Sequence, residues 1–370
     1  MNKRIMCSPV LGISILLAAA ARPIQGQESS NEPLRLVRAD RLIGSSPGEA
    51  RQVKLVGNVV FQQGETDLIC DEATHFEDRQ WAELRGRVHI RDGEHVLDAD
   101  TVTIDTRERL ETARGHVVLE TRGRRISSRF LSYSQTSKIA HARQDVLLED
   151  LIRKARLTSG SLTYNRILDY AHAEGSPVLA AEDTSSGEEM IVSGRIMDGW
   201  GESQKVLVTD SVRIAKGDVR AEAGLLEYHA KDRLLLLQAV PVIYEKKQTM
   251  RADSIEFYLV EDEFDRGSLR GNATIVQKDS LTEDVLKGNL ILMTTEPDSI
   301  RRVVVQGRAE SVYHSEEEEG GKGKNQLSGD RLTLLFRGGE IQWIQVESNP
   351  GLCTGTFTPE GGDEKVAGQP

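Results

Sequence analysis

The feature that most constrains this chain is an internal repeat of about 29 residues. A glycine with apolar residues at alternate positions around it recurs at Gly57, Gly86 and Gly115, and equivalent anchors continue to Ser348 at intervals of 29 to 41 residues. Apolar residues at every second position are typical of a strand with one buried face. A repeat of this length predicts a stack of similar units, each in contact mainly with its neighbours.

A second motif lies between the anchors and predicts a corner in each repeat. It has apolar residues at its first, sixth and eighth positions and a small residue at its third. The step of three residues interrupts the alternation, so a bulge or bend must restore the inward direction. The motif occurs at residues 97–104, 126–133, 157–164, 250–257 and 327–334.

These two patterns predict an all-β fold, an elongated two-sheet solenoid of about ten repeats. The repeat domain is expected over residues 27–355, and it allows two halves at about 34–180 and 190–355. The acidic and glycine-rich segment 316–324 is expected to be a solvated excursion. Residues 356–370 are expected to be a disordered tail.

The N-terminus has the pattern of a secretory signal peptide. Lys3 and Arg4 precede an apolar run over 10–21, and small residues follow as far as Gly26. The alternative, an uncleaved anchor, needs a run of about 20 apolar residues, and this one is shorter. Residues 1–26 are therefore expected to be removed on export. Cys70 and Cys353 would then remain, and we expect two separate thiols with at least one buried.

Charge and hydropathy exclude several classes of partner. Asp and Glu number 58 against 47 Lys and Arg, which gives a net charge of −11. Bulk attraction to nucleic acid or to an anionic membrane surface is therefore not expected. No stretch after residue 30 has the apolar length of a membrane span. The mature protein is expected to be soluble.

Residues that could carry catalysis are scattered. The eight histidines do not cluster, and the Cys70 and His75 pair lacks the second pair that zinc requires. The segment 321–324 lacks the spacing of a phosphate-binding loop. Asp100 and Asp253, at the predicted corners, are interpreted as solvated or turn-capping carboxylates. We therefore expect no enzymatic activity, no cofactor and no metal.

The Gly-Asn-Val-x-apolar segment at 57–61 and the apolar-x-Ala-Asp segments at 97–100 and 250–253 alternate about every 29 residues behind the signal peptide. In this they resemble the OstA-like (organic solvent tolerance-like) family of periplasmic lipopolysaccharide-transport proteins, over about residues 36–352. The resemblance implies a V-shaped open β-jellyroll that holds lipid acyl chains between two sheets. It also implies a periplasmic location, with outer-membrane association as a further expectation. The chain departs from the family in having about ten repeats, and it lacks the barrel of the outer-membrane member.

The resemblance predicts a non-enzymatic carrier or bridge for lipopolysaccharide. The residues expected to line the lipid groove are Val88, Ile90, Leu97, Val117, Leu119, Ile126, Val146, Leu148 and Leu157. A basic edge follows matching strands of two repeats, formed by Arg122, Arg124, Arg125, Arg153, Lys154 and Arg156. These cations either belong to solvated turns without a ligand or contact the phosphates and acidic sugars of a bound lipid.

The expected partners are other jellyroll transport proteins, or a second copy of this chain joined head to tail. Strands around 36–42 and 341–346 would supply the free edges for strand addition. Two alternatives stay open. One is a structural solenoid or filament scaffold whose sheets are packed shut, and the other is a carbohydrate-active β-helix enzyme.

Overall fold

The computed structural model describes residues 35–44, 52–93, 95–121, 123–152, 154–182, 187–260, 263–279, 281–296, 300–317, 321–337, 340–348 and 353–359. Within these residues the predicted all-β class is confirmed, because the chain forms 26 strands and one short 3-10 helix, η2 (Glu77–Arg79). Among them, no helix has the length and apolar character needed to span a bilayer. The signal peptide predicted at 1–26 lies outside the described residues.

The described chain divides into two compact units, with the boundary at residue 208 inside strand β15 (Lys205–Lys216). The N-terminal unit comprises β1 to β14. Its strands are β1 (Arg35–Arg38), β2 (Arg41–Gly44), β3 (Gln52–Gln63), β4 (Thr66–Phe76), β5 (Trp81–Asp92), β6 (His95–Asp105), β7 (Leu110–Thr121), β8 (Arg124–Ser134), β9 (Ile139–Asp150), β10 (Ala155–Asn165), β11 (Tyr170–Glu174), β12 (Val178–Glu182), β13 (Glu189–Ser193) and β14 (Ile196–Trp200).

The C-terminal unit comprises β16 to β26. Its strands are β16 (Val219–His229), β17 (Leu234–Gln238), β18 (Val242–Glu245), β19 (Gln248–Arg251), β20 (Ser254–Val260), β21 (Glu263–Lys278), β22 (Glu283–Glu296), β23 (Ile300–Glu317), β24 (Gly321–Arg337), β25 (Glu340–Glu347) and β26 (Thr354–Pro359).

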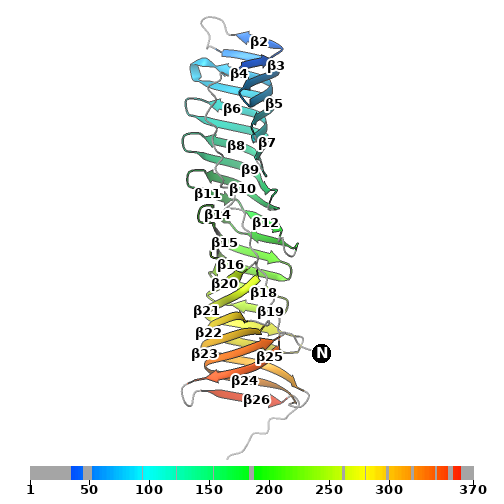
Figure 1. Cartoon of the computed structure of the whole chain (residues 1–370), viewed down its shortest axis with the longest axis vertical. Coiled ribbons are helices and arrows are strands. Elements are labelled where there is room, and N and C mark those ends of the chain that lie inside the picture. Colours follow the sequence, from blue (N-terminus) through cyan, green and yellow to red (C-terminus); the bar gives the residue numbers. More distant parts are fainter. Residues whose placement is uncertain are drawn as a thin grey trace, which may run out of the picture. The chain divides into compact units, whose positions relative to one another are not determined.

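Strands β3 to β10 of the N-terminal unit are long and pair successively in antiparallel order, each with the strand before and after it (Figure 1). Every pair shifts register once near its middle, as between Arg85 and Val88 in the β5 and β6 pair. The long strands therefore bend there and contribute to two sheets. Sheet A contains segments such as 88–92 and 95–99, and sheet B contains segments such as 81–85 and 101–105.

On β6 and β8 the bend lies within the motif that predicts a corner, but on the neighbouring strands it is built at the glycine anchor, from two consecutive residues with positive φ. Gly86 (73°) and Arg87 (45°) form it in β5, and Gly115 (70°) and His116 (38°) form it in β7. A Cβ at Gly86 would overlap the carboxylate of Asp71 on the preceding strand, so only glycine fits. This close approach explains why the anchor is so often glycine.

Polar side chains bond across these corners. Asn58 Nδ2 donates to Asp40 Oδ2 (2.9 Å), and His116 Nδ1 bonds to Asp100 Oδ2 (2.9 Å). Asn272 Nδ2 bonds to Asp253 in the C-terminal unit, at 3.3 Å to each oxygen. The interpretation of Asp100 and Asp253 as turn-capping carboxylates therefore agrees with their contacts.

Two segments of the C-terminal unit differ from the sequence expectation. The excursion expected at 316–324 is wrong, because β23 reaches Glu317 and β24 begins at Gly321, with Glu316 opposite Lys322. Backbone pairing continues here whatever the polarity of the side chains. The disordered tail is expected to begin at residue 356, but residues up to Pro359 belong to β26. This strand pairs with the first half of β24 and places Gly323 opposite Pro359.

Candidate functional site

The candidate site is the inner face of the N-terminal unit, the face toward which the buried residues of both sheets point. On sheet A a row next to the corner alternates larger and smaller side chains across paired strands. This corner row consists of Val59, Cys70, Val88, Ala99, Val117, Ser128, Val146 and Ser159, and all eight are buried. Large residues opposite small ones let the strands turn tightly without leaving a void.

One step further from the corner lies a continuous second row of large apolar side chains. It contains Phe61, Leu68, Ile90, Leu97, Leu119, Ile126, Leu148, Leu157, Leu179 and Val192, each facing the next across a strand pair. Its exposure changes along the chain. Phe61, Ile90, Leu97, Leu119 and Ile126 are half-buried and Leu68 among them is buried, whereas from Leu148 onward every member is buried. The inner face is thus partly open over β3 to β8 and covered from β9.

The nine predicted lining residues are all placed in these two rows. Val88, Val117 and Val146 belong to the corner row, and the other six belong to the second row. Sequence reasoning missed Leu68, whose strand lacks the second motif. Cross-strand pairing alone brings it between Phe61 and Ile90.

Sheet B offers a matching inner face. Its row next to the corner is buried throughout, from Leu55 and Ala73 through Leu84, Val102, Ala113, Leu131, Ala142, Leu162 and Ala173 to Met197. The following row contains Ile104, Tyr133 and Tyr164, all half-buried, with the charged Glu111 between Ile104 and Tyr133. Both sheets therefore present covered residues at the corner, but the row further out is apolar throughout only on sheet A.

The predicted basic edge is largely neutralised by carboxylates. Arg125 Nε lies 3.5 Å from Glu120, Lys154 Nζ lies 2.7 Å from Glu182, and Arg156 Nη2 lies 3.1 Å from Glu189. Arg125 and Arg156 are in register with Glu149 between them. Arg122 and Arg153 lie outside the described residues. A phosphate would have to compete with these carboxylates, which favours the solvated-turn interpretation.

Arg124 differs from the other cations because it points inward. It shares the inward phase of Ile126 on β8, and its side chain is 23% exposed. Its Nε lies 3.5 Å from Oδ2 of Asp150, whose side chain is only 4% exposed. Asp150 also accepts a hydrogen bond from the backbone amide of Ile152 (3.1 Å).

Tyr164 and Asp169 face this pair from sheet B. Tyr164 Oη donates to Asp169 Oδ1 (3.1 Å). Burial, with the charge and hydrogen bond of Asp169, raises the pKa of Tyr164 to about 12. Burial also raises the pKa of Asp169 above its usual range, and the positive charge of Arg124 acts against both increases. Arg124 is therefore close enough to interact electrostatically with groups on the opposite sheet.

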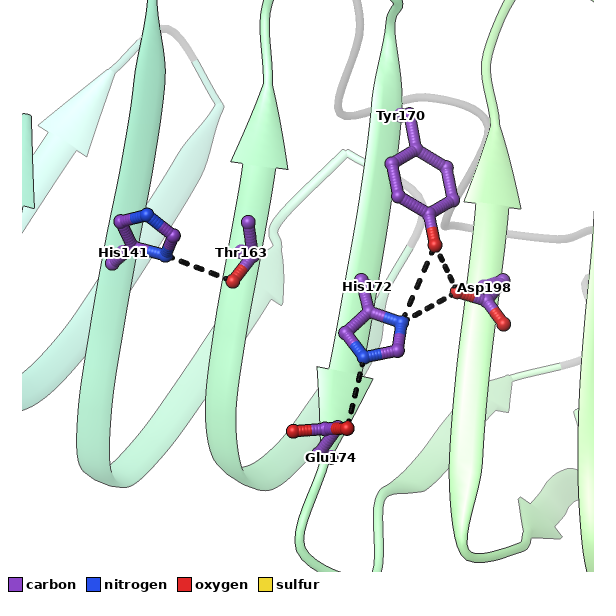
Figure 2. Close-up of polar contacts among 6 residues, drawn as sticks. All are labelled: His141, Thr163, Tyr170, His172, Glu174 and Asp198. Atoms are coloured by element: carbon purple, nitrogen blue, oxygen red, sulfur yellow. Dashed lines mark hydrogen bonds and ion pairs between the residues drawn. The ribbon is translucent and has the colours of Figure 1, made fainter. Parts of the chain in front are cut away.

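The outer face of sheet B carries a polar cluster where β9, β10, β11 and β14 pair (Figure 2). His172 bonds through Nδ1 to Asp198 (2.6 Å) and through Nε2 to Glu174 (3.1 Å), and Tyr170 Oη donates to Asp198 (2.5 Å). Burial disfavours the imidazolium, but the bonds to Asp198 and Glu174 outweigh it and raise the pKa of His172. This cluster points away from the inner face.

No arrangement for metal or thiol chemistry is present in the described part of the chain. No group of three or more His, Cys, Asp or Glu residues there could hold a metal ion. Within the described residues, Cys70 and Cys353 are both free thiols, as predicted, with Cys70 buried and Cys353 exposed. Burial raises the pKa of the Cys70 thiol to about 11, so it is protonated and unreactive near neutral pH.

Bent antiparallel strands that present apolar inner faces from two sheets define the open β-jellyroll class. Residues 32–140 match the family model described as OstA-like protein, so the predicted resemblance is confirmed over that segment. The match runs from β1 into β9 and thus covers the half-buried part of the inner face. The search of curated proteins found no match for the chain.

Proposed function

We propose that this protein is a non-enzymatic carrier or bridge for lipopolysaccharide in the periplasm, and that its N-terminal unit holds the acyl chains on its inner face. The observation that carries the proposal is the second row over β3 to β8, where five of the six large apolar side chains stay half-buried. Soluble proteins seldom leave such a continuous apolar surface open without a ligand or partner. The OstA-like match over the same residues supports a role in lipopolysaccharide transport.

The proposed mechanism is partition. Acyl chains would leave water for the second row, which contributes about 0.8 kcal/mol for each buried methylene. Repeated strands offer similar surfaces at successive positions, so a lipid could move from one to the next without a deep energy minimum. The side chains provide no reaction in this scheme, and energy for directional movement would come from another protein.

The test compares an inward and an outward substitution at adjacent positions. Leu119→Glu places a carboxylate in the second row, and Val118→Glu places it on the opposite side of β7. With purified lipopolysaccharide and thermal melting as a folding check, we expect Leu119→Glu to bind at least tenfold more weakly and Val118→Glu to bind as the parent does. Equal loss in both variants, or no binding by the parent, would refute the proposal.

We also propose that the protein associates end to end. β1 and β2 both pair with β3, β25 and β26 both pair with β24, and β1, β2 and β26 are exposed throughout. Such strands can accept another chain by strand addition. Val37→Pro at the first edge, or proline at Ile341 or Gln345 at the last, should reduce the mass measured by light scattering at high concentration. A parent protein that stays monomeric at all concentrations would exclude self-association.

A further inference from the structure

The second row of sheet A changes from half-buried to buried between Ile126 and Leu148, which face each other directly across β8 and β9. A change between two residues that face each other directly needs a local cause. Ile126 and Leu148 are both large apolar residues, so their own hydrophobicity does not explain why only Leu148 is buried. The cause must lie in what covers the row at this point.

Polar groups from both sheets lie near this position, close enough for the charge of Arg124 to act on Tyr164 and Asp169. On sheet A, Arg124 stands one inward step beyond Ile126, and Asp150 stands one inward step beyond Leu148. The two are cross-strand partners and form an ion pair that is mostly withdrawn from water. On sheet B, Tyr164 is two residues beyond the buried Leu162 and is bonded to Asp169 in the turn after β10.

We propose that Arg124, Asp150, Tyr164 and Asp169 close the inner face between β8 and β10 and so set the end of the lipid-binding segment. This inference rests on the proposed function and adds its boundary: acyl chains occupy β3 to β8 and do not pass beyond β9 while the closure is intact. Arg124 is the central positioning residue. It pairs with Asp150 on its own sheet and attracts the polar groups on the other.

The closure has the right chemistry for this purpose. An acyl chain offers no hydrogen-bond partner, so entering this position would leave Arg124 and Asp150 desolvated and separated, which is strongly unfavourable. The half-buried leucines and isoleucines before it present no such obstacle. A lipid would therefore stop at the closure even though the second row continues as Leu148, Leu157 and Leu179.

The experiment maps bound lipid along the second row by photocrosslinking. Benzoylphenylalanine is placed singly at Ile90, Leu119, Leu157 or Leu179 in the full chain, purified lipopolysaccharide is added, and crosslinked lipid is measured after irradiation. We expect crosslinks at Ile90 and Leu119 at least tenfold above those at Leu157 and Leu179. Comparable crosslinking at Leu157 and Leu119 would overturn the boundary and leave the proposed function standing. No crosslinking at any position would count against the proposed function itself.

The role of Arg124 is tested in the same assay with a matched control. Arg124→Leu should extend crosslinking to Leu157, whereas Arg125→Leu should not, because Arg125 points outward and has an ion pair of the same 3.5 Å length with Glu120. If Arg124→Leu fails to fold, Arg124→Gln removes the charge and keeps a hydrogen-bonding side chain. An unchanged crosslinking pattern in a folded Arg124 variant would exclude the closure.

Discussion

The two units use the same repeat and differ in how far their inner faces are covered. On the sheet of the C-terminal unit that carries the second half of the motif, the residue next to the corner and the residue one row further out are both buried, as in Ile255 with Phe257 and Leu332 with Leu334. In the N-terminal unit the motif-equivalent pair is Val102 with Ile104, where only Val102 is buried. One sequence pattern therefore supports both a shut core and an open face. The packed-shut alternative describes these C-terminal pairs, whereas Leu286 and Leu327 on the other sheet are half-buried and the β3 to β8 segment is partly open.

The largest expected effect is that of a carboxylate placed at equivalent positions of the two units. Leu97 and Met250 both begin the second motif, and Met250 is buried while Leu97 is half-buried. Met250→Glu should cost several kcal/mol and unfold the C-terminal unit, because an isolated carboxylate would lose its water. Leu97→Glu should leave its unit folded. Hydrogen exchange measured by mass spectrometry on peptides from each unit would show this, and equal protection in both variants would remove the distinction between the units.

Truncation of a side chain to alanine should also destabilise the C-terminal unit more than the N-terminal unit, by a smaller amount than the buried carboxylate. Leu334→Ala removes a fully buried side chain and is expected to lower the free energy of unfolding by about 2–5 kcal/mol. Ile104→Ala, at the equivalent position of an N-terminal motif, should cost clearly less because part of its surface already meets water. Urea denaturation of each variant measures both values. A larger loss for Ile104→Ala would contradict the open-face description.

One corner of the C-terminal unit, at Val240, differs from the corners formed by β3 and β5. Val240 is a β-branched residue with φ of 61° and is 80% exposed, whereas Asn58 and Arg87 stand at the equivalent place in the N-terminal unit. Val240→Asn should raise the free energy of unfolding by about 1 kcal/mol, since asparagine tolerates positive φ better. Val240→Ala should give less than half of that. No gain from either substitution would mean that the corner is not strained.

The smallest expected effect concerns pH and the outer face of the N-terminal unit. The folded-state pKa of His172 lies above its ordinary value of 6.5, so the protonated residue stabilises the fold below pH 6.5. That contribution is lost as the pH rises through the folded-state pKa. From pH 6 to pH 8, we expect the Tm of the parent to fall by up to about 3 °C more than the Tm of His172→Gln falls. Calorimetry from pH 6 to pH 8 checks it, and parallel curves for the two proteins would contradict it.

The sequence was sufficient for the strands, the corners and the inward phase. Each depends on local alternation and on glycine at positions of positive φ, which are visible in a single repeat. The proposed closure could not be predicted, because Arg124 and Asp150 are brought together only by the pairing of β8 with β9, and Tyr164 lies on the other sheet. The difference between half-buried and buried leucines was also inaccessible, since Leu119 and Leu148 occupy the same place in the repeat.

The paired positive-φ residues at each corner have a consequence for assembly. A regular strand can slip by two residues and keep the same side chains inward. Here such a slip would move Gly86 and Arg87 away from the neighbouring bend and drive a side chain into the space now filled by Asp71. Each corner therefore fixes the pairing register of the next strand. Repeats joined in this way can diverge widely in their remaining residues and still align during folding.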